Sequence, residues 1–166
     1  MKNLFYFILM LVPMVSFGQS ASEFNSRGYD KHNLKDYYGA IADYTKAIEL
    51  NPDYALAYNN RGYAKVNLKD YYGAIKDFSR AIELDPNNTA AFKNRGVAKL
   101  ILEDFYGAIN DCSKAIELDS DNVQAYTVRA ACKNSLNDIN GACVDFRIAI
   151  SKGNTDNIEY VKNNCN

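Results

Sequence analysis

The chain of 166 residues has no tryptophan, a single histidine and no strong excess of charge of either sign. Its 19 basic and 20 acidic side chains do not provide the basic surface that nucleic-acid binding requires. The longest apolar run spans about 12 residues, well short of the roughly 20 that cross a bilayer. These absences argue against a nucleic-acid-binding protein and against a membrane-spanning one.

Motifs for catalysis and metal binding are also missing. The sequence contains no glycine-rich phosphate loop, no His-Glu-x-x-His and no Cys-x-x-Cys. The lone histidine, His32, has no serine or cysteine motif around it, so we interpret it as a surface residue. The segment Asp119-Ser120-Asp121 lacks the glycine and the distal glutamate of a calcium loop. We therefore predict a protein that is not an enzyme and that needs neither a metal nor a cofactor.

The first 18 residues differ from the rest of the chain. Lys2 precedes an apolar segment from Leu4 to Val15, and small residues flank Phe17 at the end of this segment. This pattern is typical of a secretory signal peptide, so we expect cleavage after Gly18 and a mature protein in the periplasm or outside the cell. A membrane anchor is the alternative, but the apolar segment is too short for it.

The remaining sequence repeats with a fixed step of 34 residues. A period of 20 to 50 residues indicates a repeat architecture, in which each unit packs only on its neighbours. The positions that recur in all four copies hold one residue type each: Arg27, Arg61, Arg95 and Arg129; Gly39, Gly73, Gly107 and Gly141; Asp43, Asp77, Asp111 and Asp145; and Ala47, Ala81, Ala115 and Ala149.

One repeat, residues 55–88, shows what each unit forms. Apolar and small residues recur at three-to-four spacing from Tyr58 to Leu68, which predicts a helix with one buried face. Asp70 is a good N-cap for a second amphipathic helix, which Pro86 terminates. Each unit is therefore expected to be a hairpin of two antiparallel helices that buries its apolar face by stacking.

The residues at set offsets in this repeat are Tyr58, Gly62, Ala74, Phe78, Ala81 and Pro86. With this pattern the chain resembles the tetratricopeptide repeat (TPR) family. The resemblance implies an all-α fold, a right-handed α-solenoid of antiparallel helix hairpins within residues 19–166. The expected repeats cover about 21–54, 55–88, 89–122 and 123–156, and a capping helix follows at about 155–164.

Two positions depart from the family pattern in every copy: arginine replaces a leucine, and lysine replaces a tyrosine. The arginine faces an aspartate across the hairpin, and a bidentate pair makes a buried arginine tolerable. A row of arginines for an anionic partner is the alternative. The predicted structural ion pairs are Arg27 with Asp43, Arg61 with Asp77, Arg95 with Asp111, and Arg129 with Asp145.

The resemblance also implies a binding surface, because the first helices of TPR repeats line a concave groove. Amides that donate and accept, together with tyrosines, suit an extended peptide. We predict a non-catalytic interaction module for a protein or peptide of unknown identity; ordinary solvated side chains are the alternative. The expected groove residues are Asn25, Tyr29, Asn33, Asn59, Asn60, Tyr63, Asn67, Lys93 and Asn94.

One TPR subtype grips a C-terminal carboxylate with a lysine and an asparagine of one repeat and basic residues two repeats later. Asn25 and Tyr29 occupy the first two of these positions here, and Val97 follows Lys93 where an asparagine would be needed. The resemblance therefore does not extend to this carboxylate clamp.

A second surface is suggested by Tyr38, Tyr72 and Tyr106, which recur on the second helices. Local packing against the neighbouring helix would explain them, and so would a tyrosine stripe on the convex side. The stripe would fit an alternative function, that of a structural subunit that self-associates or joins an envelope assembly through its convex face or its ends. Homo-oligomers remain open on this interpretation.

Four cysteines in an exported chain favour disulfides. In the hairpin of the family, facing positions sum to about 31, and Cys132 and Cys143 satisfy this rule within the last full repeat. We therefore expect a bridge between Cys132 and Cys143, with Cys143–Cys165 as the rival pairing. Cys112 occupies a core aromatic position and is expected to be a buried free thiol.

Overall fold

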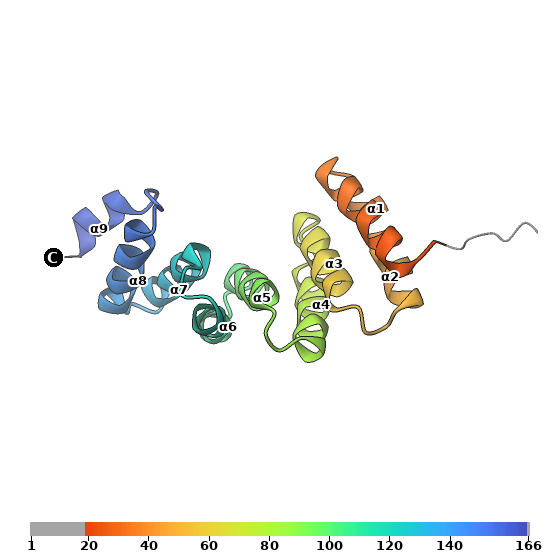
Figure 1. Cartoon of the computed structure of the whole chain (residues 1–166). Helices are drawn as coiled ribbons and strands as arrows, with labels where there is room; N and C mark the ends of the chain where they lie inside the picture. The colour runs from red at the N-terminus through yellow and green to blue at the C-terminus, as the bar shows by residue number, and fades with distance from the viewer. Residues whose placement is uncertain (1–18, 166) are drawn as a thin grey trace, which may run out of the picture.

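The structure is a computed structural model that describes residues 19–165. The predicted signal peptide, residues 1–18, lies outside the described residues. The described part is built of α-helices joined by short turns and contains no strand. The helices follow one another along an open arc, with α1 (Ala21–Asn33) at one end and α9 (Ile158–Asn164) at the other (Figure 1).

Consecutive helices form four hairpins that pack in series. The all-α solenoid of antiparallel hairpins predicted from the sequence is thus confirmed. None of the helices that the structure describes is long and apolar enough to cross a membrane. The hairpins are α1 with α2 (Tyr37–Leu50), α3 (Ala55–Asn67) with α4 (Tyr71–Leu84), α5 (Thr89–Ile101) with α6 (Phe105–Leu118), and α7 (Val123–Ser135) with α8 (Ile139–Ser151).

The turn that joins the two helices has the same backbone conformation in all four hairpins. In the second hairpin Lys69 adopts the left-handed conformation with φ of 63°, and the N–H of Asp70 donates to the carbonyl of Lys65 at 2.9 Å. The Asp70 carboxylate then caps α4 by accepting from the N–H of Gly73 at 3.0 Å. These bonds satisfy the helix-end groups that a tight turn would otherwise leave without partners.

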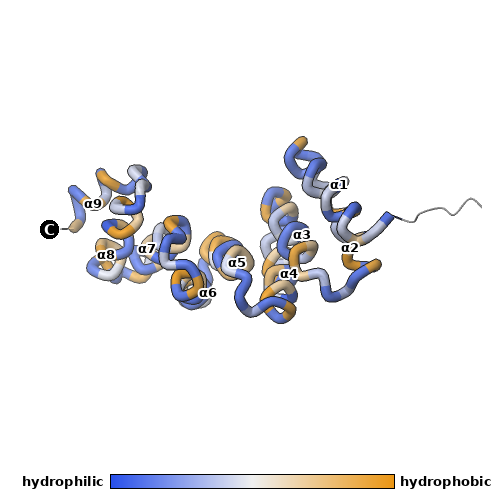
Figure 2. Tube along the Cα trace, viewed as in Figure 1, coloured by the Kyte–Doolittle hydropathy of each residue, from blue (hydrophilic) through white to orange (hydrophobic). Residues whose placement is uncertain are grey.

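Small residues let the two helices of a hairpin approach closely. A Cβ atom added at Gly62 would lie 2.8 Å from the Phe78 ring, so glycine is required at this spacing. Alanines of the same hairpin, such as Ala74 and Ala81, are fully buried as well. Hydrophobic and hydrophilic residues alternate around the helices (Figure 2), as expected when each helix buries only one face.

The C-terminal helix α9 covers the last hairpin. The Tyr160 ring lies 4.8 Å from the Phe146 ring between centroids, and the Tyr160 hydroxyl donates to the Asn134 side chain at 2.6 Å. Glu159 and Lys162 are exposed, which gives the helix the polar outer side that a solenoid end needs. The helix begins at Ile158, slightly later than the sequence indicated, because residues 155–157 form a turn.

The expected disulfide between Cys132 and Cys143 is wrong. Cys143 is bonded to Cys165, with 5.6 Å between their Cα atoms, and Cys132 is a buried free thiol. Cys132 packs in a core cluster with Cys112 and Val128, so its side chain lies in the interface between α6 and α7. Cys143 instead lies where the end of α9 reaches α8. Cys112 is buried and free.

Candidate functional site

The aspartate of each repeat is held by the arginine opposite to it. Arg61 donates from Nε and Nη2 to the two carboxylate oxygens of Asp77, at 2.9 and 2.7 Å, and Asp77 is only 3% exposed. This bidentate geometry matches the planar guanidinium to the carboxylate. The same pair of bonds is present between Arg27 and Asp43, Arg95 and Asp111, and Arg129 and Asp145.

A lysine joins each of these pairs, which the sequence analysis missed. Lys65 Nζ lies 2.7 Å from Asp77 Oδ2. The signal was present, because the lysine follows the arginine by four residues in every copy and this spacing puts both on one helix face. The other three contacts join Lys31 to Asp43, Lys99 to Asp111 and Lys133 to Asp145.

The arginines also connect successive hairpins. Arg95 Nη1 donates to Ser79 on the preceding hairpin at 3.0 Å, and Arg129 donates to Ser113 in the same way at 3.1 Å. Arg27, in the first hairpin, donates to Gln19 instead. Since each guanidinium is occupied by its own hairpin and by the segment before it, the geometry favours the structural interpretation of the arginine row.

The network changes the ionisation of Asp43 in the first hairpin. Hydrogen bonding by Arg27 lowers the pKa of Asp43, and Lys31 lowers it further against the opposing effect of burial. The Asp43 carboxylate is therefore ionised at neutral pH although it is buried. The ionised Asp43 thus keeps its pairing with Arg27 and Lys31 at neutral pH, which stabilises the first hairpin.

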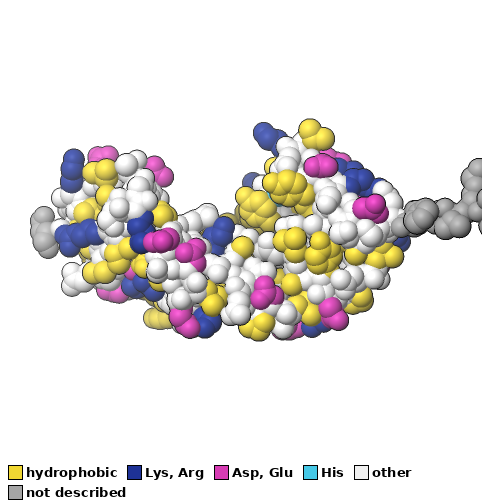
Figure 3. Space-filling view, in the orientation of Figure 1, with side chains coloured by type: hydrophobic (Ala, Val, Ile, Leu, Met, Phe, Trp, Pro, Cys, Tyr) yellow, Lys and Arg dark blue, Asp and Glu magenta, His cyan; other side chains and the backbone are white. Residues whose placement is uncertain are grey.

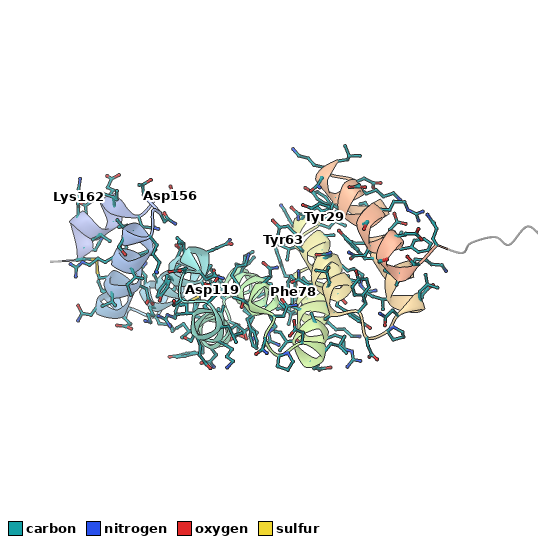
Figure 4. All side chains as sticks on the ribbon, viewed as in Figure 1. Tyr29, Tyr63, Phe78, Asp119, Asp156 and Lys162 are labelled. Carbon is teal, nitrogen blue, oxygen red and sulfur yellow. A yellow bond between two sulfur atoms is a disulfide. The ribbon has the colours of Figure 1, made fainter. Side chains whose placement is uncertain are left out.

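The concave side of the solenoid contains a hollow between α1 and α3. It has a volume of about 440 Å³. Figure 4 places Tyr29 between these two helices and Tyr63 nearby on α3, and Figure 3 shows hydrophobic side chains gathered over the same region. The lining residues are Asn25, Ser26, Tyr29, Asp30, Leu56 and Asn60.

A smaller hollow of about 60 Å³ follows along the same side and is shared by α3, α5 and α7. Helices from three successive repeats contribute to it, so the two hollows together extend across all four first helices. The lining residues are Tyr63, Val66, Lys93, Asn94, Val97 and Gln124.

Asparagine side chains connect the helices beneath these hollows. Asn60 Nδ2 donates to Asn25 Oδ1 at 3.1 Å, and Asn94 Nδ2 donates to Asn59 Oδ1 at 3.2 Å. Asn25 and Asn59 are 7% and 9% exposed, so both are largely withdrawn from solvent. Each bond joins neighbouring repeats, and the predicted groove residue Asn59 therefore serves packing.

The structure brings most of the predicted groove residues together. Asn25, Tyr29 and Asn60 line the larger hollow, and Tyr63, Lys93 and Asn94 line the smaller one. The remaining two, Asn33 and Asn67, lie exposed at the ends of α1 and α3 and line neither hollow.

Six lining residues were missed. Most of them occupy helix positions that face the groove in the family, but only amide, tyrosine and lysine side chains were selected from those positions. The residues missed for this reason are Ser26, Leu56, Val66 and Val97; Gln124 was missed because no residue of the fourth repeat was selected, and Asp30 lies one position outside the family register.

His32 lies at the surface but is only partly exposed. Its ring is half-buried and packs edge-on against Tyr37 and Tyr63, with centroid distances of 5.2 and 5.0 Å. Nε2 lies 3.2 Å from the side-chain nitrogen of Asn67. Burial lowers the pKa of His32, so the ring is neutral near pH 7. The histidine thus supports the position of Tyr63 at the groove.

The second helices of the first three hairpins, α2, α4 and α6, carry a set of exposed tyrosines. Tyr38, Tyr72 and Tyr106 are 77%, 77% and 72% exposed, so the interpretation that they pack against a neighbouring helix is wrong.

No group of three or more histidine, cysteine, aspartate or glutamate side chains within residues 19–165 is placed to hold a metal ion.

Comparisons with known proteins agree with this architecture. A family model described as "Tetratricopeptide repeat" matches residues 55–88, and one described as "TPR repeat" matches residues 28–69. A search of curated proteins finds none that matches this chain.

Several solved structures are similar. The second TPR domain of human RPAP3, in complex with the HSP70 peptide SGPTIEEVD, is 32% identical over 68% of this chain and 94% of that domain, with a TM-score of 0.66. The first TPR of Spaghetti (RPAP3), bound to the HSP90 peptide SRMEEVD, is 27% identical over 72% and 94%, with a TM-score of 0.71. MamA shares the fold, with 21% identity over 80% and 77% and a TM-score of 0.76. The chain belongs to the tetratricopeptide repeat family.

Proposed function

We propose that this protein is a non-catalytic interaction module that binds an extended peptide or protein segment in the concave groove formed by α1, α3, α5 and α7. The observation that carries the proposal is the pair of hollows on this side, with the half-exposed rings of Tyr29 and Tyr63 at their edges. Tyrosines provide flat contact area with a polar tip, which suits an extended segment. Both RPAP3 domains are similar to this chain and hold peptides.

The amides of the groove can serve the backbone of such a segment. Asn60 uses one N–H to bond Asn25, which leaves its side-chain oxygen as an acceptor. Ser26 and Tyr29 add hydroxyl groups around the same hollow. A backbone that needs a donor and an acceptor at each residue therefore meets both along α1 and α3.

The ligand differs in chemistry from the peptides held by the relatives. Those peptides end in Glu-Glu-Val-Asp. In this chain the larger hollow contains no cationic side chain, and Asp30 is its only charged residue. An acidic chain end would be repelled there, so we assign this hollow to an apolar or basic side chain.

Removal of the two groove tyrosines tests the proposal. Short random peptides displayed on phage would be selected on the immobilised protein, and the selected peptides measured against Tyr29→Ser/Tyr63→Ser. We expect this variant to lose binding while its helical content stays unchanged. Tyr72→Ser/Tyr106→Ser, which alters only exposed rings on the second helices, is the matched control. Equal binding by both variants would show that the groove is not the binding surface.

The exposed Tyr38, Tyr72 and Tyr106 support a second candidate, a structural subunit that self-associates through this tyrosine set. Exposed aromatic patches commonly mark interaction surfaces. Sedimentation velocity over a concentration series distinguishes the two functions. Dimers or larger species that disappear in Tyr72→Ser/Tyr106→Ser favour the structural subunit, and a monomer at all concentrations counts against it.

We also propose that the protein is exported and cleaved after Gly18. The disulfide between Cys143 and Cys165 supports this, because such bonds persist mainly in oxidising compartments. N-terminal sequencing of the protein isolated from its natural source tests it. A mature chain that begins at Gln19 is the expected result, and a retained Met1 in an intracellular fraction would contradict it.

A further inference from the structure

Asp30 provides the charge of the larger hollow between α1 and α3, and no cation of the described chain pairs with it. The arginine and the lysine of the same helix, Arg27 and Lys31, are both bound to Asp43. Within residues 19–165 the Asp30 carboxylate forms no ion pair and accepts no hydrogen bond. It therefore remains available to a cation from a ligand.

The charge of Asp30 is also felt in the protein beneath the hollow. The Tyr44 side chain is fully buried and packs with Ala64 of α3, and its hydroxyl has no hydrogen-bond partner within the described part of the chain. Burial raises the pKa of Tyr44 to about 12, and the charges of Tyr29, Asp30 and Asp43 add to this shift. Since Asp43 has its own arginine, the charge of Asp30 is the one that no neighbouring group offsets.

The other polar atoms of the hollow suit a ligand with several donors. Ser26 and Tyr29 carry hydroxyl groups that can accept, and Asn60 keeps its side-chain oxygen after it donates to Asn25. Leu56, 47% exposed, adds an apolar surface beside them. A cationic group with more than one N–H can thus bond to Asp30 and to neutral oxygens at the same time.

A guanidinium group fits this set better than an ammonium group. It presents five donors in a planar fork, pairs with a carboxylate through two bonds and stacks on aromatic rings. The chain uses the same combination internally, because Arg27 pairs with Asp43 and its Cζ lies 4.6 Å from the centroid of the Phe24 ring. Tyr29 and Asp30 offer a ring and a carboxylate at the hollow.

We propose that the larger hollow holds an arginine side chain of the segment that lies along the groove, with the guanidinium on Asp30 and Tyr29 and the aliphatic stem on Leu56. The inference rests on the proposed function and names one residue of its ligand. The apolar or basic side chain assigned to this hollow is thereby narrowed to arginine.

Peptide selection on the full protein tests this assignment. We expect random peptides displayed on phage and selected on the wild-type protein to be enriched in arginine relative to the unselected library, and more so than in lysine. Selection on Asp30→Asn should lose this enrichment, and selection on Asp30→Arg should favour aspartate and glutamate. Glu159→Gln, at an exposed carboxylate of α9, is the matched control and should keep the arginine preference.

Affinities measured by fluorescence anisotropy make the test quantitative. An enriched peptide should bind the wild-type protein roughly fivefold tighter than the same peptide with citrulline, a neutral side chain of the same shape, in place of arginine; this is the upper end for a partly exposed ion pair. Asp30→Asn should abolish the difference, and Glu159→Gln should retain it. Because salt screens the pair, the difference should also shrink between about 0.1 M and 1 M sodium chloride.

The outcomes separate the two proposals. If peptides bind through Tyr29 and Tyr63 but show no arginine preference, or keep it in Asp30→Asn, the arginine assignment is wrong and the proposed function stands. If a lysine peptide binds as tightly as its arginine counterpart, the guanidinium assignment is likewise wrong. If no peptide is selected, or if none depends on the two tyrosines, the proposed function fails and this inference fails with it.

Discussion

Arg61 joins two hairpins through its hydrogen bond to Thr45, from Nη1 to Oγ1 at 3.1 Å. Its remaining donors hold Asp77 on its own hairpin, so one side chain fixes both the fold of a repeat and its position on the repeat before it. The hydroxyl side chain that accepts this bond is present in the first three hairpins and absent from the last. Arg147 replaces the serine or threonine in the last hairpin, and it donates to the carbonyl of Cys165 beside α9.

Replacement of Arg61 should lower the stability of the protein strongly, and replacement of its hydroxyl partner Thr45 should lower it less. Arg61→Leu leaves the buried Asp77 with Lys65 alone, and we expect a loss of about 2–4 kcal/mol in the free energy of unfolding. Thr45→Val removes one hydrogen bond to a charged group and should cost roughly 1–2 kcal/mol. Urea unfolding followed by circular dichroism measures both.

A double-mutant cycle identifies the link between the hairpins. If Arg61 and Thr45 interact as described, the double variant loses less stability than the sum of the two single variants. Thr155→Val, at an exposed threonine, is the control and should be neutral. Strict additivity of Arg61→Leu and Thr45→Val would show that the bond contributes nothing to stability.

The disulfide should stabilise the C-terminal end of the solenoid. Cys143 and Cys165 are 22 residues apart, and closing a loop of that length contributes about 3 kcal/mol in the chain-entropy model. Reduction of the wild-type protein should therefore lower the temperature at which it unfolds and expose the amides of α9 to hydrogen exchange. The variant Cys165→Ser should show the lower stability without reductant and no further response to it.

Peptide mapping under non-reducing conditions checks the pairing itself. Cys143 should be recovered in a peptide joined to Cys165, and alkylation after denaturation should label Cys112 and Cys132 as free thiols. A peptide that joins Cys132 to Cys143 would restore the pairing expected from the sequence and contradict the one described.

The repeat itself made most of the fold predictable. A step of 34 residues placed the arginine and the aspartate at equivalent points of every hairpin, and the periodic aspartates before the second helices indicated the N-caps. A pattern shared by four copies reports the packing of each repeat on itself and on the next. It could therefore reveal pairs such as Arg61 and Asp77 without any knowledge of coordinates.

The parts that break the repeat were harder to predict. The disulfide depends on how α9 docks on α8, which occurs once and leaves no periodic signal, so a rule for facing positions inside one hairpin selected Cys132 instead of Cys165. The hydrogen bond from Lys93 to Gln124 was not predicted for the same reason. It depends on Gln124 and on the three helices that meet there, and other repeats have asparagine or threonine at the position of Lys93.

The hairpin turns offer a way to stabilise the protein. Lys69 has φ of 63°, a conformation that costs a residue with a side chain about 1 kcal/mol and that glycine adopts freely. Lys69→Gly should therefore raise the free energy of unfolding by roughly 0.5–1 kcal/mol after the entropy of the unfolded chain is included. Asn137→Gly, at the same position of the last hairpin, should gain less because asparagine tolerates this conformation. Equal gains at both positions, or a loss at Lys69, would contradict this account.

The half-buried histidine should make stability depend on pH just below neutrality. Burial lowers the pKa of His32 in the folded protein, and Tyr37, Tyr63 and Asn67 around it provide no negative charge to stabilise the protonated ring. The unfolded chain therefore binds a proton more readily than the folded one. The contribution of His32 is fully present above its unfolded pKa of about 6.5 and is lost as the pH falls from there through the lower folded value.

His32→Gln isolates this effect, because the chain has no other histidine. We expect the wild-type protein to lose more stability than the variant between pH 7 and about pH 5, a range above that in which carboxylates such as Asp43 become protonated. Chemical denaturation at several pH values measures the difference. Since the ring contacts Tyr63, protonation should also loosen that side of the groove and weaken peptide binding over the same range. Parallel stability curves for the two proteins would show that His32 remains as accessible to protons in the folded state as in the unfolded chain.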